Sequence, residues 1–171
     1  TYSIVDMLFA RCQSVSLTGL DRPFKIIWDS RKLRLPEEAD YGDIAILVRL
    51  TTWAGDTLEG VGLLEAKRRD SGKASFSSVR VTQLKRILRK APSSRLLLYD
   101  YDNVSSCMDN VAAPYEDYFD DWRSGHIEPY THSVCVSTGL ALSRNQFTTG
   151  LHKFGVPLAH QLVARYFRGL D

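Results

Sequence analysis

The sequence is poor in cysteine and has no long apolar run. Its 171 residues include three cysteines, and their scattered positions form neither a disulfide framework nor a zinc-binding spacing. No stretch approaches the roughly 20 apolar residues that a membrane span needs, and no signal peptide is visible. We therefore expect a protein of a reducing, cytoplasmic setting that has no membrane partner.

Several common site patterns are missing as well. The four histidines lack metal-ligand spacing, and there is no glycine-rich phosphate loop of either common type. Neither Ser137 nor Ser143 has a catalytic base at a recognisable offset. Internal repeats and low-complexity tracts are absent. These absences argue against a histidine metal centre, a P-loop or dinucleotide site and a serine nucleophile.

The composition is that of an ordinary globular domain. Hydrophobic residues make up 44% of the chain and charged residues 25%. The length predicts a single domain over residues 1–171, with residues 103–130 as a possible insertion. The chain begins at Thr1 rather than methionine, so we expect it to be part of a longer polypeptide.

Positive charge is concentrated in one stretch. Residues 65–95 carry a net charge of +8, whereas the rest of the chain carries −6. A basic patch suits a polyanion such as nucleic acid, although a charge run can also be a solvated face. The candidate phosphate contacts are Arg68, Arg69, Lys73, Arg80, Arg86 and Arg89.

Hydrophobic periodicity predicts alternating helices and strands. In the first part of the chain, the expected elements are a helix over 2–13, a strand over 24–28 near a sheet edge, a charged loop over 31–41 and two hairpin strands between residues 43 and 67. A helix from the 75–78 capping residues to about Lys90, a strand over 95–99 and an interrupted late strand over 134–142 follow. The last element is a terminal helix from Pro157, with Leu158, Leu162, Val163 and Tyr166 on one side. This order predicts an α/β fold with a central mixed β-sheet flanked by helices.

Charged residues stand at the ends of the two hairpin strands, where a buried strand should have none. Because side chains alternate along a strand, Glu65 and Lys67 share one face and Ala66 points away. The hairpin places Asp43 on the neighbouring strand, beside Glu65. A buried charge is costly unless it is paired or bound to metal. We therefore expect these three charges to meet at one end of the sheet, where they can hold Mg²⁺ and touch a phosphate.

Polar residues also fall inside the apolar stripe of the helix that follows. At 100° per residue, Arg80 and Gln83 lie among Leu84 and Ile87. They can face the carboxylates or a bound phosphate, or each can satisfy a nearby backbone group. The acids that follow the next strand, Asp100 and Asp102, are expected to cap its end.

Together, Gly42-Asp43 and Glu65-Ala66-Lys67 on consecutive strands resemble the PD-(D/E)xK nuclease superfamily, which has the restriction-endonuclease-like fold. The resemblance covers roughly residues 1–100. It implies that Asp43, Glu65 and the Ala66 carbonyl bind Mg²⁺ or Mn²⁺, and that Lys67 positions or activates the attacking water. Gln83 matches a polar position found in several branches.

The sequence departs from this family in three places. Gly42 replaces the proline of the first motif, and Ile87 stands where the exonuclease branch has an aromatic residue. The acid that many members carry in the first helix has only Asp6 as a candidate here.

Three hypotheses follow. The first is a Mg²⁺-dependent DNA endonuclease, expected to act on double-stranded DNA as a module of a defence, restriction or repair protein and to need a homodimer for double-strand cutting. The second is a catalytically inactive nucleic-acid-binding domain of the same fold. The third is a protein-interaction domain that uses the acidic aromatic stretch 114–125.

Overall fold

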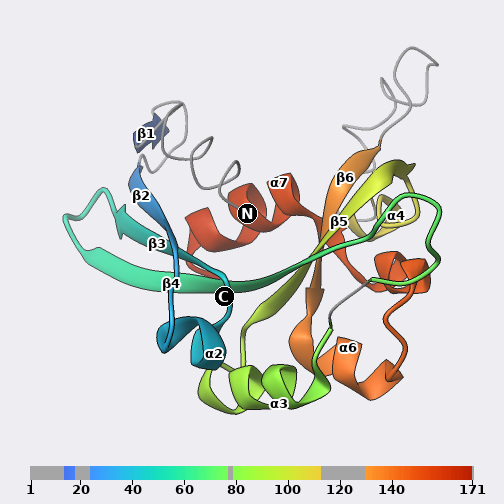
Figure 1. Cartoon of the computed structure of the whole chain (residues 1–171). Coiled ribbons are helices and arrows are strands. Elements are labelled where there is room, and N and C mark those ends of the chain that lie inside the picture. Colours follow the sequence, from blue (N-terminus) through green and yellow to red (C-terminus); the bar gives the residue numbers. More distant parts are fainter. Residues whose placement is uncertain (1–13, 18–23, 77–78, 113–129, 171) are drawn as a thin grey trace, which may run out of the picture.

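The structure, a computed structural model, describes residues 14–17, 24–76, 79–112 and 130–170 (Figure 1). In this part of the chain, seven strands form one sheet in sequential order. The strands are β1 (Ser14–Leu17), β2 (Phe24–Lys32), β3 (Ile44–Thr51), β4 (Thr57–Arg68), β5 (Arg95–Val104), β6 (Thr131–Ser137) and β7 (Val156–Pro157). The predicted α/β class with a mixed sheet is confirmed.

Helices cover both faces of this sheet. They are α2 (Glu37–Tyr41), α3 (Val81–Lys90), α4 (Asp109–Ala112), α6 (Thr138–Arg144), the 3₁₀ helix η2 (Thr149–Phe154), and a C-terminal run of α7 (Leu158–His160), the π-helical η3 (Gln161–Arg165) and the 3₁₀ helix η4 (Tyr166–Arg168). In Figure 1, α2, α3 and α6 lie below the sheet, and the C-terminal run lies above it. None of the helices in the described part of the chain has the length and apolar character needed to cross a bilayer.

The sheet is mixed because one of its connections is a crossover. Every neighbouring pair is antiparallel except β4 and β5, which are parallel. Parallel strands cannot be joined by a tight turn, and α3 supplies the crossover between these two. The end of β4 therefore lies close to the start of α3.

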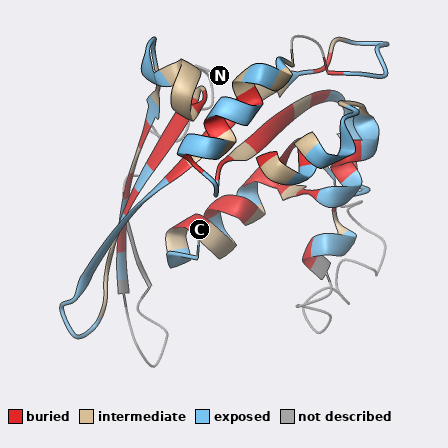
Figure 2. Cartoon of the chain, turned by 90° about the horizontal axis from the view of Figure 1, so that it is seen from below, coloured by how far each residue is buried: buried red, intermediate tan, exposed pale blue. Residues whose placement is uncertain are grey.

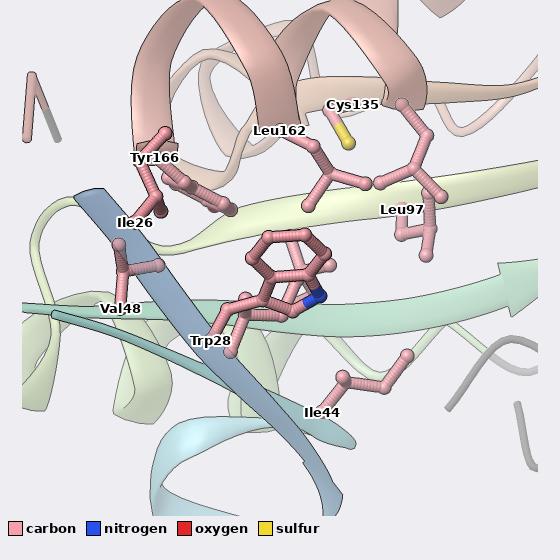
Figure 3. Close-up of a cluster of buried hydrophobic side chains, with 11 residues drawn as sticks. Ile26, Trp28, Ile44, Val48, Leu97, Cys135, Leu162 and Tyr166 are labelled. Atoms are coloured by element: carbon pink, nitrogen blue, oxygen red, sulfur yellow. The ribbon is translucent and has the colours of Figure 1, made fainter. Parts of the chain in front are cut away.

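Two apolar clusters occupy the two faces of the sheet. The cluster beneath the C-terminal helical run contains Trp28 (Figure 3). Its ring stacks on that of Phe167, with centroids 4.6 Å apart. The other cluster packs Leu84 and Ile87 of α3 against β5 and β6. In Figure 2 the buried residues follow the strands and the inner sides of the helices, whereas the tip of the β3–β4 hairpin is exposed.

Strand alternation decides which residues face α3. Ile44, Ile46 and Val48 of β3 all belong to the cluster under the C-terminal run. Residues at the alternate positions, beginning with Asp43, therefore face the opposite side, where α2 and α3 lie. This alternation aims the candidate site residues at the helices.

Three predictions about the first half of the chain are corrected. The segment 24–28 is not at the sheet edge, because β2 pairs with both β1 and β3. The segment 31–41 is not only a loop, since β2 extends to Lys32 and α2 follows. The helix after β4 does not begin at residues 75–78, because Ser75 and Phe76 form β-bridges and are held extended.

Two further corrections concern the C-terminal half. The late strand ends at Ser137, which pairs with Arg95, the first residue of β5. The Thr138 amide still donates a 3.2 Å hydrogen bond to the Ser94 carbonyl, and from Thr138 the chain forms α6. Val163 does not share the buried side of the terminal helix, since it is 65% exposed while Leu162 and Tyr166 are buried. The π-helical turn at this point displaces side chains from α-helical spacing.

Some predictions fall on residues outside the described part of the chain. These are the helix over 2–13 and most of the possible insertion, including the acidic stretch 114–125. Within 103–112, β5 continues to Val104 and α4 follows.

Candidate metal and phosphate cleft

Pairing between β3 and β4 brings Asp43 close to Glu65. Ile44 pairs with Leu64 at the end of the antiparallel register, and the amide of Asp43, the residue before β3, donates a 2.8 Å hydrogen bond to the Leu64 carbonyl. Asp43 therefore lies beside the end of β4, and it lines the same cleft as Glu65. The two acids reach the same end of the sheet from neighbouring strands.

Gly42 makes this close approach possible. Its φ is 99°, and a Cβ at this position would lie 2.8 Å from the Leu64 carbonyl oxygen. Proline, whose φ is fixed near −65°, cannot adopt this conformation. The departure from the superfamily motif thus follows from the local backbone.

Asp43 is held by the backbone of β4. Its Oδ2 accepts a 2.8 Å hydrogen bond from the Ala66 amide. The amide and carbonyl of one strand residue point to the same side of the strand. The Ala66 carbonyl therefore points toward the Asp43 side, away from β5.

Glu65 is almost fully buried, and only one of its two carboxylate oxygens has a polar partner among the described residues. Its side chain is 1% exposed, and Oε1 lies 2.6 Å from Nζ of Lys67. Its Oε2 is also buried and has no hydrogen-bond partner among the described residues. A buried carboxylate oxygen without a donor is costly. This oxygen is suited to a cation or a donor from a ligand.

The pKa of Glu65 lies above its ordinary value. Burial is the main cause, because it disfavours the charged form. The Lys67 ammonium lowers this pKa, while the negative charges of Asp43 and Glu38 raise it. Both acids therefore oppose the effect of the Lys67 ammonium on this pKa, and burial adds to theirs.

A cleft of about 480 Å³ opens over these residues. The sheet contributes Glu65 and Lys67 of β4, and Asp43, which precedes β3. The rest of the lining comes from α3 and from the segment that contains α2. The lining residues from the helices are Glu38 and Ala39 of α2, and Arg80, Thr82, Gln83 and Arg86 at or near the start of α3.

The structure therefore brings six of the predicted site residues to one cleft. Asp43, Glu65, Lys67 and Gln83 line it, as do the predicted phosphate contacts Arg80 and Arg86. Arg89 lies on the exposed surface of α3, outside the cleft lining, and Lys73 is exposed in the connection before α3. Arg80 is exposed instead of buried, because it precedes the first turn of α3.

Arg69 lies in a different environment from the one predicted. It is 6% exposed, and its guanidinium binds Asp100 and Asp102 and donates to the Lys73 carbonyl. A buried guanidinium with these partners is not available to a phosphate. The same contacts show that the two acids pair with Arg69 and do not cap β5.

Arg68 points away from the cleft. Its guanidinium lies 3.3 Å from Asp70 and 6.0 Å from the ring centroid of Tyr101. It lines a separate pocket of about 400 Å³ together with Ala66 and Tyr99. This placement follows from strand alternation, because Arg68 and Ala66 share the face opposite Lys67.

Sequence reasoning missed Glu38. This acid lines the cleft from α2, and its negative charge raises the pKa of Glu65. The signal was Pro36 followed by two glutamates, since proline and acids are typical of the start of a helix.

The donor set fits a small divalent cation. Among the described residues, no group of three His, Cys, Asp or Glu side chains is arranged to hold a metal. Mg²⁺, however, usually takes one or two carboxylates and completes its shell with water and substrate phosphate. The carboxylates of Asp43 and Glu65 match that number, and Oε2 of Glu65 has no hydrogen-bond partner among the described residues.

Comparisons of the chain with protein-family models, with curated proteins and with solved structures returned no match. Any functional assignment therefore depends on the chemistry of the cleft itself.

Proposed function

We propose that this chain is a Mg²⁺-dependent nuclease of the PD-(D/E)xK type, with the restriction-endonuclease-like fold, which hydrolyses phosphodiester bonds in DNA. The observation that carries the proposal is the cleft. It combines two carboxylates and a lysine from the sheet with Arg80, Gln83 and Arg86 at or near the start of α3. Acidic metal ligands facing arginines are the groups needed to hold a cation and a phosphate together.

Each of these two groups of residues has a separate task in this proposal. Asp43, Glu65 and the Ala66 carbonyl hold the metal. When bound, the metal neutralises phosphate charge and makes water more acidic. Lys67 places a compact positive charge beside the reacting phosphate and stabilises the negative charge that develops there. Arg80 and Arg86 bind the phosphate backbone, and Gln83 donates from its amide.

The second hypothesis, a catalytically inactive nucleic-acid-binding domain, differs in one measurable respect. An inactive domain binds DNA but leaves it intact whatever the metal. The preserved set of Asp43, Glu65 and Lys67 in a single cleft favours the nuclease.

The deciding experiment is a plasmid-nicking assay of the purified chain with Mg²⁺, with Mn²⁺ and with EDTA. We expect nicking with either metal and none with EDTA. Glu65→Gln should abolish nicking, whereas Glu37→Gln, which changes an exposed acid of α2 outside the cleft lining, should retain it. Equal activity of the wild type and Glu65→Gln, or DNA binding without cutting in both metals, would overturn the proposal.

A further inference from the structure

The Lys67 ammonium is already ion-paired within the cleft. Its side chain is 11% exposed, and its ammonium lies 2.6 Å from Oε1 of Glu65. The two residues are separated by one position on β4, so the strand itself sets the pair. Lysine is a strongly hydrated ion, and it is buried only where a partner compensates for the lost water.

The carboxylate with which Lys67 pairs is also the one proposed to hold the metal. A cation that approaches Glu65 meets an ammonium already in contact with one of its two oxygens. The metal must therefore weaken or displace that contact. Asp43 offers no such competition, because its Oδ2 accepts from a neutral backbone amide.

We propose that Lys67 is a built-in counter-ion that competes with the metal for Glu65, and that metal binding releases the ammonium toward the substrate phosphate. This inference rests on the proposed function, since it describes the control of the same site. In the absence of substrate, the pair keeps Glu65 compensated and the metal weakly bound. A phosphate offers the released ammonium a new partner, so metal and substrate strengthen each other's binding, and thermodynamic linkage makes that effect reciprocal.

The charge of the cleft supports competition at close range. The negative charges of Asp43 and Glu38 act on Glu65, yet among the described residues Lys67 is the cation in contact with its carboxylate. Arg80 and Arg86 line the same cleft, but neither forms an ion pair with Glu65 in the described part of the chain. A test can therefore separate the contact itself from the general positive charge of the cleft.

The experiment measures Mn²⁺ binding to the full chain without DNA, by calorimetry and by the electron paramagnetic resonance signal of free Mn²⁺. Lys67→Met removes the competing ammonium, so it should bind Mn²⁺ about tenfold more tightly than the wild type, which corresponds to about 1.4 kcal/mol. Arg86→Met removes one positive charge from the same cleft and should change the affinity much less. Glu65→Gln should lose the site, which assigns the signal to this cleft.

Folding and proton competition are controlled in the same series. Circular dichroism and thermal unfolding check every variant, and Lys67→Gln, which keeps a neutral donor, replaces Lys67→Met if the latter does not fold. Measurement at about pH 8 keeps proton competition for the carboxylate small. Mn²⁺ affinity that is unchanged or weaker in the Lys67 variants, or equal gains in Lys67→Met and Arg86→Met, would overturn the inference.

The outcomes also separate this inference from the proposed nuclease activity. If the wild type nicks DNA but Lys67→Met shows no gain in Mn²⁺ affinity, the counter-ion role fails and the nuclease stands. If Lys67→Met binds Mn²⁺ more tightly but the wild type cuts no nucleic acid, the nuclease fails and the counter-ion role stands. If neither the wild type nor Lys67→Met binds Mn²⁺ and the wild type cuts no DNA, both are wrong.

Discussion

The amide of Ala66 donates a 2.8 Å hydrogen bond to Oδ2 of Asp43. This contact joins the two strands of the hairpin where their regular pairing ends, and it holds one proposed metal ligand, the Asp43 carboxylate, against the residue whose carbonyl is another. Asp43 therefore has a structural role in addition to its proposed chemical one. The two roles can be separated by choosing the replacement.

Asp43→Asn should abolish metal-dependent nicking with little change in stability. An asparagine side-chain oxygen can still accept from the Ala66 amide, but it lacks the charge that holds a cation. Asp43→Ala should also be inactive, and in addition should lose about 1–3 kcal/mol of unfolding free energy, because the Ala66 amide is left without its acceptor. Urea unfolding of both variants checks the difference. Equal stabilities would show that the hydrogen bond does not hold the hairpin end.

The Arg69–Asp100 pair should make stability depend on pH. Burial raises the pKa of Asp100, but hydrogen bonds from Arg69 and from the Asp102 amide outweigh it and leave the pKa below the ordinary value. The stabilisation is therefore fully present above the unfolded carboxyl pKa of about 4. It should be lost as the pH falls through the lower, folded pKa.

Asp100→Asn tests this dependence. The variant should be less stable than the wild type at neutral pH, and its stability should change less on acidification. Asp102→Asn is the matched control, because Asp102 also binds Arg69 but its side chain is 75% exposed. Chemical unfolding from neutral pH to about pH 3 provides the measurement. A wild type and an Asp100→Asn variant with parallel profiles would contradict the assignment.

Arg86 and Arg89 should contribute to DNA affinity without reading sequence. Both are exposed on α3, but only Arg86 lines the cleft. Removing a phosphate contact should lower the slope of log affinity against log salt by about one unit. We therefore expect Arg86→Ala to weaken binding to two unrelated duplexes equally, and Arg86→Ala with Arg89→Ala to weaken it further.

Lys153→Ala is the control for this pair, since Lys153 is exposed and does not line the cleft. The measurement is a salt titration of binding with Ca²⁺ in place of Mg²⁺. An arginine pair variant that binds as the wild type does at low salt would place the DNA on another surface.

Gly62→Ala should destabilise the fold, because a Cβ at this position would lie 2.5 Å from the Tyr166 ring. The ring belongs to the apolar cluster that holds η4 against the sheet (Figure 3). Overpacking of this kind costs about 1–3 kcal/mol. Gly60→Ala, on the same strand with no atom within 4 Å of the added Cβ, should be close to neutral. Thermal unfolding of the two variants gives the comparison, and equal melting temperatures would mean that Tyr166 moves aside freely.

Short-range geometry was sufficient to predict the three charged residues that the hairpin contributes to the cleft. Glu65 and Lys67 share a face because a strand has a period of two, whatever the rest of the fold. Asp43 meets them because the two apolar runs are close in sequence and form a hairpin. Leu84 and Ile87 are buried for a comparable local reason, the helical spacing of apolar side chains.

Whether an arginine of the basic stretch is buried or exposed depended on partners distant in the sequence. Arg69 directly follows β4 and, by strand alternation, is on the same face as Glu65 and Lys67. Its position in the sequence is therefore the one expected of a site residue. It is buried because β5 brings Asp100 and Asp102 beside it, more than 30 positions later in the chain. A basic residue in a basic run does not reveal such a pairing.

Tertiary structure also decided which helices form the cleft. Glu38 reaches the carboxylates because β2 pairs with β3 as far as Lys32 and Ile44, which leaves the intervening residues to form α2 at that end of the sheet. Likewise, the late strand ends at Ser137, opposite Arg95 at the start of β5, and the chain continues as α6. The sequence by itself determined the charged triad, through the period of a strand and the short hairpin. Only the tertiary structure decided what surrounds that triad, because strand pairing partners and buried ion pairs are set by contacts between residues far apart in the chain.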